Sequence, residues 1–265
     1  MSYLQIEHVS HLFFNRHGFT KALEDVDCAI EEGEFVSILG PSGCGKSTLL
    51  SILAGITEET FGQISLQQKP LKQSKEKIGY MLQQDYLFPW KTIMDNILLG
   101  PKVQKAQLIE AKEKAHTLLE EVGLPDISEQ YPHALSGGMR QRVALVRTLM
   151  NDPSIFLLDE PFSALDYFTK LKLEDLIATI LKEYHKTTIL VTHDIGEAIS
   201  MSDRIFILSK QPGKLVETIE IPAELRQETP FLSRRHPTYQ PIFDKVWGIM
   251  NHLEQKGSRG NEGTT

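Results

Sequence analysis

The 265-residue sequence lacks the features that mark several classes of protein. It has only two cysteines, Cys28 and Cys44, which are too few for a disulfide framework. It contains no apolar run of about 18 residues, so we expect no membrane-spanning helix, and its N-terminus does not read as a secretory signal peptide. A net charge of −7 offers no basic surface for nucleic acid. We therefore expect a soluble intracellular protein that binds no nucleic acid.

A glycine-rich segment at residues 40–48 is the strongest functional signal in the sequence. It matches the phosphate-binding pattern G-x-x-x-x-G-K-[ST] and lies between an apolar run at 35–39, predicted as a strand, and a predicted helix at 49–54. Glycines let successive backbone N–H groups point at phosphate oxygens, and the helix adds the positive end of its dipole. We therefore predict that a nucleoside triphosphate binds to Gly40, Pro41, Ser42, Gly43, Cys44, Gly45, Lys46, Ser47 and Thr48.

Three side chains of this segment carry specific expectations. Lys46 would reach the β- and γ-phosphates, and Ser47 would bind Mg²⁺. Cys44 leaves two interpretations open. Amide dipoles of the loop could lower the pKa of its thiol and make it reactive, whereas a small side chain could simply fill space in the loop.

Two further predicted strands place polar residues near this loop. The apolar run 155–158 is typical of a buried parallel strand and leads to Asp159 and Glu160, and the run 187–191 leads to His193. Because open α/β sheets bind ligands at the carboxyl ends of their strands, we expect these three residues to face the phosphates. Asp159 would hold Mg²⁺ through water, Glu160 would orient or deprotonate the attacking water, and His193 would contact a phosphate.

The remaining elements are predicted from periodicity and turn residues. Apolar residues recur at helical spacing through 92–124, and this block interrupts the alternation of strands and helices, which indicates an inserted helical subdomain. Another helix is predicted at 168–184. After a turn-rich stretch from residue 222, a short helix is predicted near 242–253, and 257–265 is predicted to be disordered. Strands are predicted at 3–9, 22–30, 61–66, 78–82, 204–208 and 214–221.

Ser136 begins a further predicted helix, which runs to about residue 150. Ser136 is a good N-cap, and Gly137 and Gly138 after it leave the first backbone amides uncovered. From these residues alone two interpretations stay open: a second anion-binding helix start, or an ordinary capped helix.

In their order along the chain, these motifs resemble those of the ATP-binding-cassette (ABC) ATPases. The resemblance spans about residues 3–221 and includes Leu-Ser-Gly-Gly-Met-Arg-Gln at 135–141 and Ile-Phe-Leu-Leu-Asp-Glu-Pro at 155–161. Ser-Ala-Leu-Asp at 163–166 and Thr-His-Asp at 192–194 complete the set. Many kinases and GTPases share a phosphate loop, so the Ser-Gly-Gly signature upstream of Asp-Glu is the more specific feature.

The resemblance implies an α/β fold, with a P-loop NTPase core built on a mixed sheet, an antiparallel β edge subdomain and an inserted helical subdomain. The core would comprise residues 1–82 and 159–221. The helical subdomain with the signature motif would be 83–158, and 222–265 would be a C-terminal extension whose last residues are disordered.

The resemblance also implies an ATP hydrolase that forms a homodimer when ATP binds. Two copies would pack head to tail, so that each ATP lies between the phosphate loop of one copy and the signature residues Ser136, Gly137 and Gly138 of the other. The catalytic residues would be Lys46, Glu160 and His193, and Asp166 would act toward the partner's site. Bound Mg²⁺ would be held by Ser47, Gln83 and Asp159.

An aromatic side chain before the phosphate loop would stack on the adenine ring. Phe13 matches the position of this residue in the family, and Phe14 is the alternative. The family more often has tyrosine at this position, so the sequence departs from the pattern here.

The segment 83–92, with Asp95 and Asn96, resembles most closely the importer ATPases for nitrate, sulfonates and taurine, a group that also serves pyrimidine precursors of thiamine. This resemblance implies an integral membrane permease as partner and, indirectly, an extracytoplasmic solute-binding protein. The permease would contact the surface near Trp90, for which a buried aromatic is the alternative interpretation. The chain would then lie on the cytoplasmic face of the cell membrane as a peripheral subunit, and its partners would select the solute.

Three other functions fit parts of the sequence. A soluble ABC ATPase acting on nucleic acid or the ribosome usually carries two cassettes, coiled-coil arms or zinc modules, which do not occur here. The Pro89-Trp90 region resembles importer ATPases more than it resembles exporter ATPases. A small-molecule kinase with a phosphate loop would leave residues 135–141 without a role.

Overall fold

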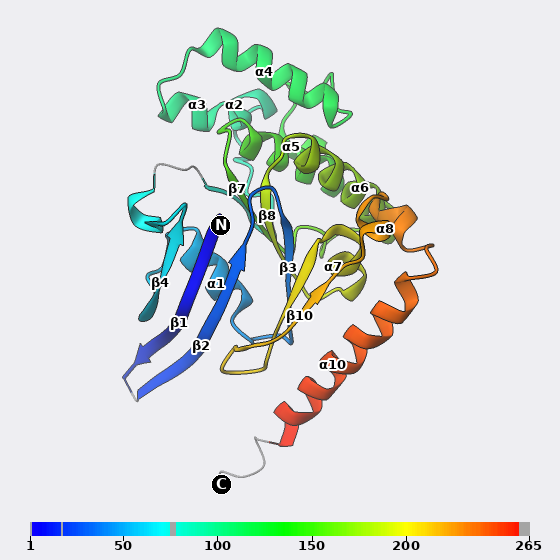
Figure 1. Ribbon diagram of the computed structural model, residues 1–265. Coiled ribbons are helices and arrows are strands. Elements are labelled where there is room, and N and C mark those ends of the chain that lie inside the picture. The colour runs from blue at the N-terminus through cyan, green and yellow to red at the C-terminus, as the bar shows by residue number, and fades with distance from the viewer. Residues whose placement is uncertain (1, 17, 75–77, 260–265) are drawn as a thin grey trace.

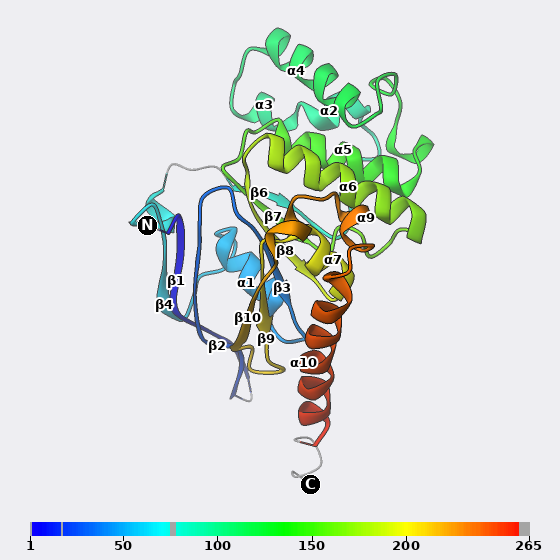
Figure 2. The same ribbon diagram turned by 45° about the vertical axis from the view of Figure 1, so that its right-hand side comes forward.

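The computed structural model describes residues 2–16, 18–74 and 78–259. Two β-sheets and several groups of helices make up this part of the chain (Figure 1). The larger sheet forms the centre of the molecule, and the smaller sheet lies beside it with α1 (Lys46–Leu53) between the two. A layer of helices caps one end, and the last helix runs away from that layer along the other side (Figure 2).

The larger sheet determines where the predicted site residues lie. Its strand order is β10-β9-β3-β8-β7-β6, and all neighbours are parallel except β9 and β10. Since β3, β8 and β7 are parallel neighbours, the segments that follow these three strands meet at one edge of the sheet. The bounds are β3 Phe35–Leu39, β6 Ile78–Met81, β7 Ile155–Asp159, β8 Thr187–Thr192, β9 Arg204–Leu208 and β10 Leu215–Glu220.

The smaller sheet is antiparallel, and its first two strands are longer than predicted. Its order is β2-β1-β4-β5, with β1 Leu4–Asn15, β2 Gly18–Ile30, β4 Phe61–Leu66 and β5 Lys69–Pro70. His8 and Asp25 have positive φ angles of 50° and 51°, and the β1–β2 register shifts around them. These bulges break the alternation of apolar and polar residues, which is why the pattern ended the first predicted strand too early.

The helical layer comes from the segment between β6 and β7. It holds α2 (Ile93–Ile97), α3 (Leu99–Val103), α4 (Leu108–Glu121) and α5 (Gly137–Leu149). Helices α2, α4 and α5 share one apolar core with α6 (Tyr167–Glu183) and one face of the larger sheet. Gly123, with φ of 71°, ends the stretch after α4 as the sequence predicted. Short 3₁₀ turns occur at Leu71–Gln73 and Pro132–Ala134.

The C-terminal part contains more helix than the sequence indicated. The elements are α7 (Ile195–Met201), α8 (Ala223–Arg226), α9 (Pro230–Ser233) and α10 (Tyr239–Arg259). Val246 and Met250 of α10 pack with α7 and β9 in a third apolar cluster. Helix α10 is therefore longer at both ends than the predicted helix 242–253, and it extends into the segment 257–265 for which disorder is predicted. Residues 260–265 lie outside the described residues.

Gly62 allows a test of the smaller sheet. Its φ is 87°, and a Cβ there would lie 2.4 Å from the carbonyl oxygen of His8. We expect Gly62→Ala to lower the free energy of unfolding by about 2–3 kcal/mol, because it adds both backbone strain and a clash with β1. Urea denaturation followed by circular dichroism measures this loss.

Gly55 is the matched control, because it also has a positive φ, 70°, but a Cβ there would meet open space. Gly55→Ala should cost only about 1 kcal/mol. Equal losses in the two variants would contradict the close approach of β1 and β4.

Candidate nucleotide-binding site

The phosphate loop joins β3 to α1 in the predicted order of strand, loop and helix. Gly43 and Gly45 have φ angles of 76° and 96°, which only glycine adopts readily. A Cβ on Gly45 would lie 2.7 Å from the carbonyl oxygen of Ala22, and a Cβ on Gly40 would lie 2.9 Å from that of Leu208. The loop is therefore a tight backbone cradle with the helix N-terminus behind it, which fits a phosphate.

Lys46 lies within this cradle. Its side chain is buried, and its Nζ donates to the carbonyl oxygens of Gly40 at 2.7 Å and Pro41 at 3.2 Å. The ammonium group is thus held inside the loop, where a phosphate oxygen could take over these bonds.

Cys44 is fully buried, with its Sγ 3.8 Å from the Lys46 Nζ. Burial raises the pKa of this thiol. The structure therefore favours the space-filling interpretation of Cys44 over the reactive one, which needs a lowered pKa.

Ser47 and Asp159 form an oxygen pair next to the loop. The Ser47 Oγ donates to Asp159 Oδ1 at 3.1 Å, and the Tyr80 hydroxyl donates to Oδ2 at 3.2 Å. Burial raises the pKa of Asp159, and a nearby cation would favour its charged form. Mg²⁺ usually takes one or two protein ligands and completes its shell with phosphates and water. Ser47 and Asp159 could therefore be the protein ligands of Mg²⁺. The described part of the chain contains no group of three or more histidine, cysteine, aspartate or glutamate residues that could hold a metal ion.

Glu160 and His193 meet at the same edge of the sheet. His193 Nδ1 lies 3.1 Å from Glu160 Oε2, although the two residues follow different strands. Glu160 has a φ of 46°, and its N–H donates to the carbonyl of Val191 at 2.9 Å. A non-glycine residue in this conformation is strained, and strain of this kind concentrates at functional sites. The carboxylate and the imidazole can therefore share a proton or a water molecule here.

Gln83 is connected to this pair through Ser163. Its Nε2 donates to Ser163 Oγ at 3.0 Å, and Ser163 Oγ donates to the carbonyl of Glu160 at 3.0 Å. The backbone carbonyl of Gln83 accepts from Gln141 of α5 at 3.0 Å. The structure thus places Gln83 beside Glu160, with its amide bonded to Ser163 and not to the Ser47–Asp159 oxygen pair.

The signature residues lie at the start of α5. Ser136 accepts from the N–H of Met139 at 3.3 Å, so it caps the helix as predicted. A Cβ on Gly138 would lie 2.4 Å from the Thr169 side chain in the first turn of α6. Asp166, which is exposed, caps α6 by accepting from the N–H of Thr169 at 3.1 Å, and this bond lowers the pKa of its carboxyl. The start of α5, with the exposed Ser136, and the start of α6, with the exposed Asp166, therefore lie side by side and form one surface.

This surface and the phosphate loop are carried by different elements of the chain. Helix α1 packs against β2, β7 and β8, whereas α5 packs against α2, α4, α6 and β6. Figure 2 shows α5 in the helical layer and α1 between the sheets. One copy thus presents two helix N-termini, each suited to an anion, at separate places.

The structure also separates Phe13 from Phe14. Phe13 is half-exposed, and its ring contacts the buried His11 ring edge-on, with centroids 4.6 Å apart. His11 pairs with Leu23, whose side chain packs beside Gly45 of the loop. Since successive residues of a strand alternate faces, Phe13 lies on the loop side and Phe14 on the other. This arrangement favours Phe13 for stacking on a base.

Arginines of α5 hold the segment that follows Gln83, a feature that sequence patterns did not indicate. Arg140 Nε contacts Asp85 Oδ2 at 2.9 Å, and Arg147 donates to the carbonyls of Asp85 at 2.6 Å and Tyr86 at 2.8 Å. Tyr86 has a positive φ of 45°. Charged donors to backbone carbonyls thus stabilise a strained turn.

The held segment presents aromatic side chains to solvent. Trp90 is 70% exposed, which contradicts the interpretation of a buried aromatic, and its ring lies 5.2 Å from that of Phe88. Asn96 is fully buried and bonds four times to the segment, accepting from Phe88 N–H and donating to the carbonyls of Phe88, Lys91 and Thr92. The exposure of these rings is therefore built into the local structure.

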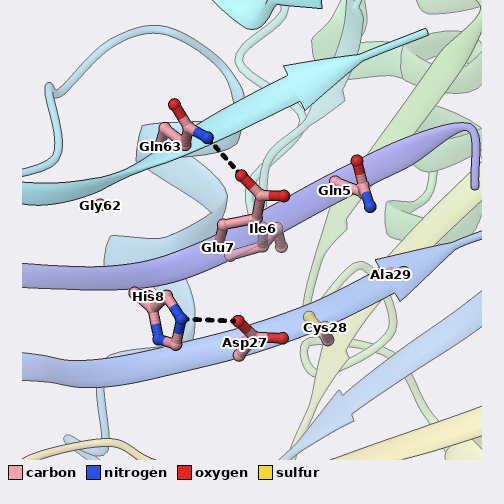
Figure 3. Close-up of a pocket in the computed structure, with 9 residues that line it drawn as sticks. All are labelled: Gln5, Ile6, Glu7, His8, Asp27, Cys28, Ala29, Gly62 and Gln63. Carbon is pink, nitrogen blue, oxygen red and sulfur yellow. Dashed lines mark hydrogen bonds and ion pairs between the residues drawn. The ribbon is translucent and has the colours of Figure 1, made fainter. Parts of the chain in front are cut away.

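A hollow on the outer face of the smaller sheet is separate from this site. Figure 3 shows it lined by β1, β2 and β4, with His8 facing Asp27 and Gln63 bonded to Glu7. Burial raises the pKa of Cys28, which also lines it, to about 12. None of the predicted site residues lines this hollow.

Comparison with known proteins decides the family. The family model described as ABC transporter matches residues 23–163. An uncharacterized ABC transporter ATP-binding protein, YtlC of Bacillus subtilis, is 52% identical over 97% of this chain and 98% of its own. The chain belongs to the ABC transporter ATPases. The prediction of the family is thus confirmed.

Other relatives carry more specific names. The aliphatic sulfonates import ATP-binding protein SsuB of Bacillus licheniformis is 41% identical over 90% of this cassette and 91% of its own chain. The taurine import ATP-binding protein TauB of Roseobacter denitrificans is 35% identical over 99% of both chains.

A solved cassette confirms the predicted fold class. The dimeric post-hydrolysis state of the ATP-binding cassette MJ0796, bound to ADP and Pi, matches with a TM-score of 0.73 and 32% identity. The match covers 83% of this chain and 99% of that one.

Arg147 provides a test of the arginine contacts. Arg147→Met removes two charge-assisted bonds to the strained Asp85–Tyr86 turn, so we expect unfolding to become easier by about 2–3 kcal/mol. Amide hydrogen exchange should rise at residues 84–88. Lys102→Met, which removes an exposed ion pair with Asp95, should cost less than about 1 kcal/mol. Unchanged exchange at 84–88 would contradict the role of Arg147.

Proposed function

We propose that this chain is the ATP-hydrolysing subunit of an importer, acting as a homodimer beneath a membrane permease. The observation that carries the proposal is the meeting of Lys46, the Ser47–Asp159 pair and the Glu160–His193 pair at one edge of the parallel sheet. These groups can bind a terminal phosphate, hold the cation that balances its charge, and orient the water molecule that attacks it.

Each of these groups has a distinct task in hydrolysis. The loop amides and Lys46 would bind the β- and γ-phosphates, and Ser47, Asp159 and Gln83 would hold Mg²⁺, directly or through water. Mg²⁺ would supply charge neutralisation of the phosphates when bound. Glu160 would accept a hydrogen bond from the attacking water, and His193 would hold Glu160 and contact the γ-phosphate.

A second copy would complete the site. Ser136 to Gly138 form the start of α5, which is carried by other elements than the phosphate loop of the same chain, so the anion that this helix start would bind is the γ-phosphate on the partner copy. Asp166 lies on the same surface and would approach the partner's site. The similar cassette MJ0796, whose solved structures are dimeric, supports this arrangement. ATP would then stabilise the closed dimer because it contacts both copies there.

The permease would bind at the exposed aromatic surface of Tyr86, Phe88 and Trp90. Exposed aromatic side chains on a rigid turn are typical anchors of protein interfaces. The turn is bonded to α5, which carries the signature residues, so movement of α5 on closure would reach the permease. None of the helices in the described ranges is long and apolar enough to cross a membrane, so the transport path is assigned to the permease.

The transported solute would be small and anionic, with sulfonates first among the candidates. Relatives named for aliphatic sulfonates and taurine support this choice over nitrate and aminopyrimidines. A solute-binding protein outside the membrane would deliver it, and the chain would remain on the cytoplasmic face. Within the chain, we assign ATP binding to 1–82 and 159–221, the signature and permease contacts to 83–158, and a supporting role to 222–265.

The role of Glu160 is testable by one substitution. Glu160→Gln keeps the shape of the side chain but removes the carboxylate that would orient water, so we expect hydrolysis to fall about 100-fold or more with ATP binding retained. Phosphate release measures turnover, and titration with a fluorescent ATP analogue measures binding. The exposed Glu224→Gln should behave as wild type. Hydrolysis by Glu160→Gln at the wild-type rate would refute the assignment.

The permease contact can be tested with the two tryptophans of the chain. Trp90→Ala removes a 70% exposed ring from the aromatic surface and should weaken copurification with the permease by about tenfold, because anchor residues dominate interface energy. Trp247 on α10 is 58% exposed and stacks on Phe243, so Trp247→Ala is the matched control. Equal effects of both substitutions would place the interface elsewhere. ATP binding by the isolated chain should stay unchanged in both variants.

A further inference from the structure

A cluster of charged side chains lies between α6, α7 and the C-terminal extension, away from the phosphates. Lys170 of α6 contacts Asp194 Oδ2 and Glu197 Oε1, each at 2.5 Å. Arg234, which follows α9, contacts Glu174 Oε2 of α6 at 2.6 Å. Glu174 is fully buried, Glu197 is nearly so, and the side chain of Arg234 is 17% exposed. Two cations therefore face three carboxylates, of which Glu174 and Glu197 are buried and Asp194 is partly exposed.

This cluster fixes both neighbours of His193. Asp194 caps α7 by accepting from the N–H of Glu197 at 3.1 Å. Thr192 Oγ1 accepts from the N–H of Asp194 at 3.0 Å and donates to the Glu197 carboxylate. His193 itself is more than half exposed, so its position depends on the residues on either side of it.

The extension reaches the same turn of the chain. A Cβ on Gly196 would lie 3.2 Å from the Tyr239 hydroxyl and 3.6 Å from Arg234 Nε. Arg234 and Tyr239 thus cover the first turn of α7, directly after the His193 loop. The Phe231 N–H donates to Asp175 at 2.8 Å, which ties this part of the extension to α6 as well.

Arg234 is the residue on which the charge balance of the cluster depends. Burial raises the pKa of Glu174 to about 7, and Arg234 opposes this shift. Without Arg234, the buried Glu174 would either take up a proton or draw on Lys170, which already contacts Asp194 and Glu197. Loss of one partner of a buried pair is strongly destabilising locally, because the remaining carboxyl must be neutralised or left without its cation. The contacts of Lys170 that hold Asp194 would then weaken.

We propose that Arg234 is a positioning residue through which the C-terminal extension holds residues 192–194, and hence His193, in the geometry that hydrolysis requires. The inference rests on the role given to His193 in the proposed function. Arg234 does not touch the nucleotide in this scheme. Its effect passes through Glu174 and Lys170 to Asp194, and through its contact over Gly196 to the start of α7.

The test compares two adjacent arginines in the full-length chain. Arg234→Gln should lower kcat for ATP about tenfold or more, since small displacements of catalytic groups have large effects on rate, while the KM for ATP stays within about twofold. Hydrogen exchange should increase at residues 192–197. Arg235 is exposed and lies over the Phe231 ring, so Arg235→Gln should leave kcat and exchange at the wild-type level. Arg234→Lys, which keeps the charge, should recover part of the rate.

Several results would overturn the proposal. One is that Arg234→Gln and Arg235→Gln have equal kcat and equal hydrogen exchange at 192–197. Another is that Arg234→Gln changes the affinity for ATP and nothing else. If Arg234→Gln does not fold, Arg234→Lys and Glu174→Gln take its place, and unchanged exchange at 192–197 in both would refute the role. Hydrogen exchange also separates the role of Arg234 from the proposed function. A wild-type chain without ATPase activity would count against the proposed function, whereas the exchange comparison would still test the role of Arg234.

Discussion

Parallel pairing of β3, β8 and β7 is the constraint on which the rest of the structure depends. Because three parallel strands end at one edge, residues far apart in the sequence arrive together: Lys46 after β3, Glu160 after β7 and His193 after β8. Each strand is largely buried and has apolar residues at its centre, so its register is determined by the core and not by the polar residues at its end. The sheet can therefore hold a strained residue such as Glu160 in place.

Around this edge, polar contacts connect the site to three surfaces. Gln83 and Ser163 connect Glu160 to the segment with the exposed aromatic rings. Gln141 and the α5 arginines connect that segment to the signature helix. The buried ion pairs of α6 and α7 connect the His193 loop to the C-terminal extension. Under the proposed function, these contacts would carry movement from the γ-phosphate to the three surfaces, because the rigid elements are joined by few, specific contacts.

Much of the core could be predicted from sequence, because buried parallel strands are short apolar runs that end in motif residues. The bulges at His8 and Asp25 could not, since they break the alternation that marks a strand. Helix α7 was not predicted, although Asp194 and Glu197 have the spacing of a capping pair.

The sequence motifs predicted which residues belong to the candidate site and that they lie at one edge of the sheet. They did not predict the contacts between the side chains. The bond from Gln83 to Ser163 depends on rotamers, and the pairing of Arg234 with Glu174 joins segments that have no local pattern in common.

The most direct test is sedimentation of the Glu160→Gln chain with and without Mg-ATP. If ATP is bound between two copies, this variant should be a monomer alone and a dimer with ATP, and adding Gly137→Asp should abolish the dimer while ATP still binds to the phosphate loop. A chain that binds ATP and stays monomeric, or a dimer unaffected by Gly137→Asp, would contradict a site shared between two copies.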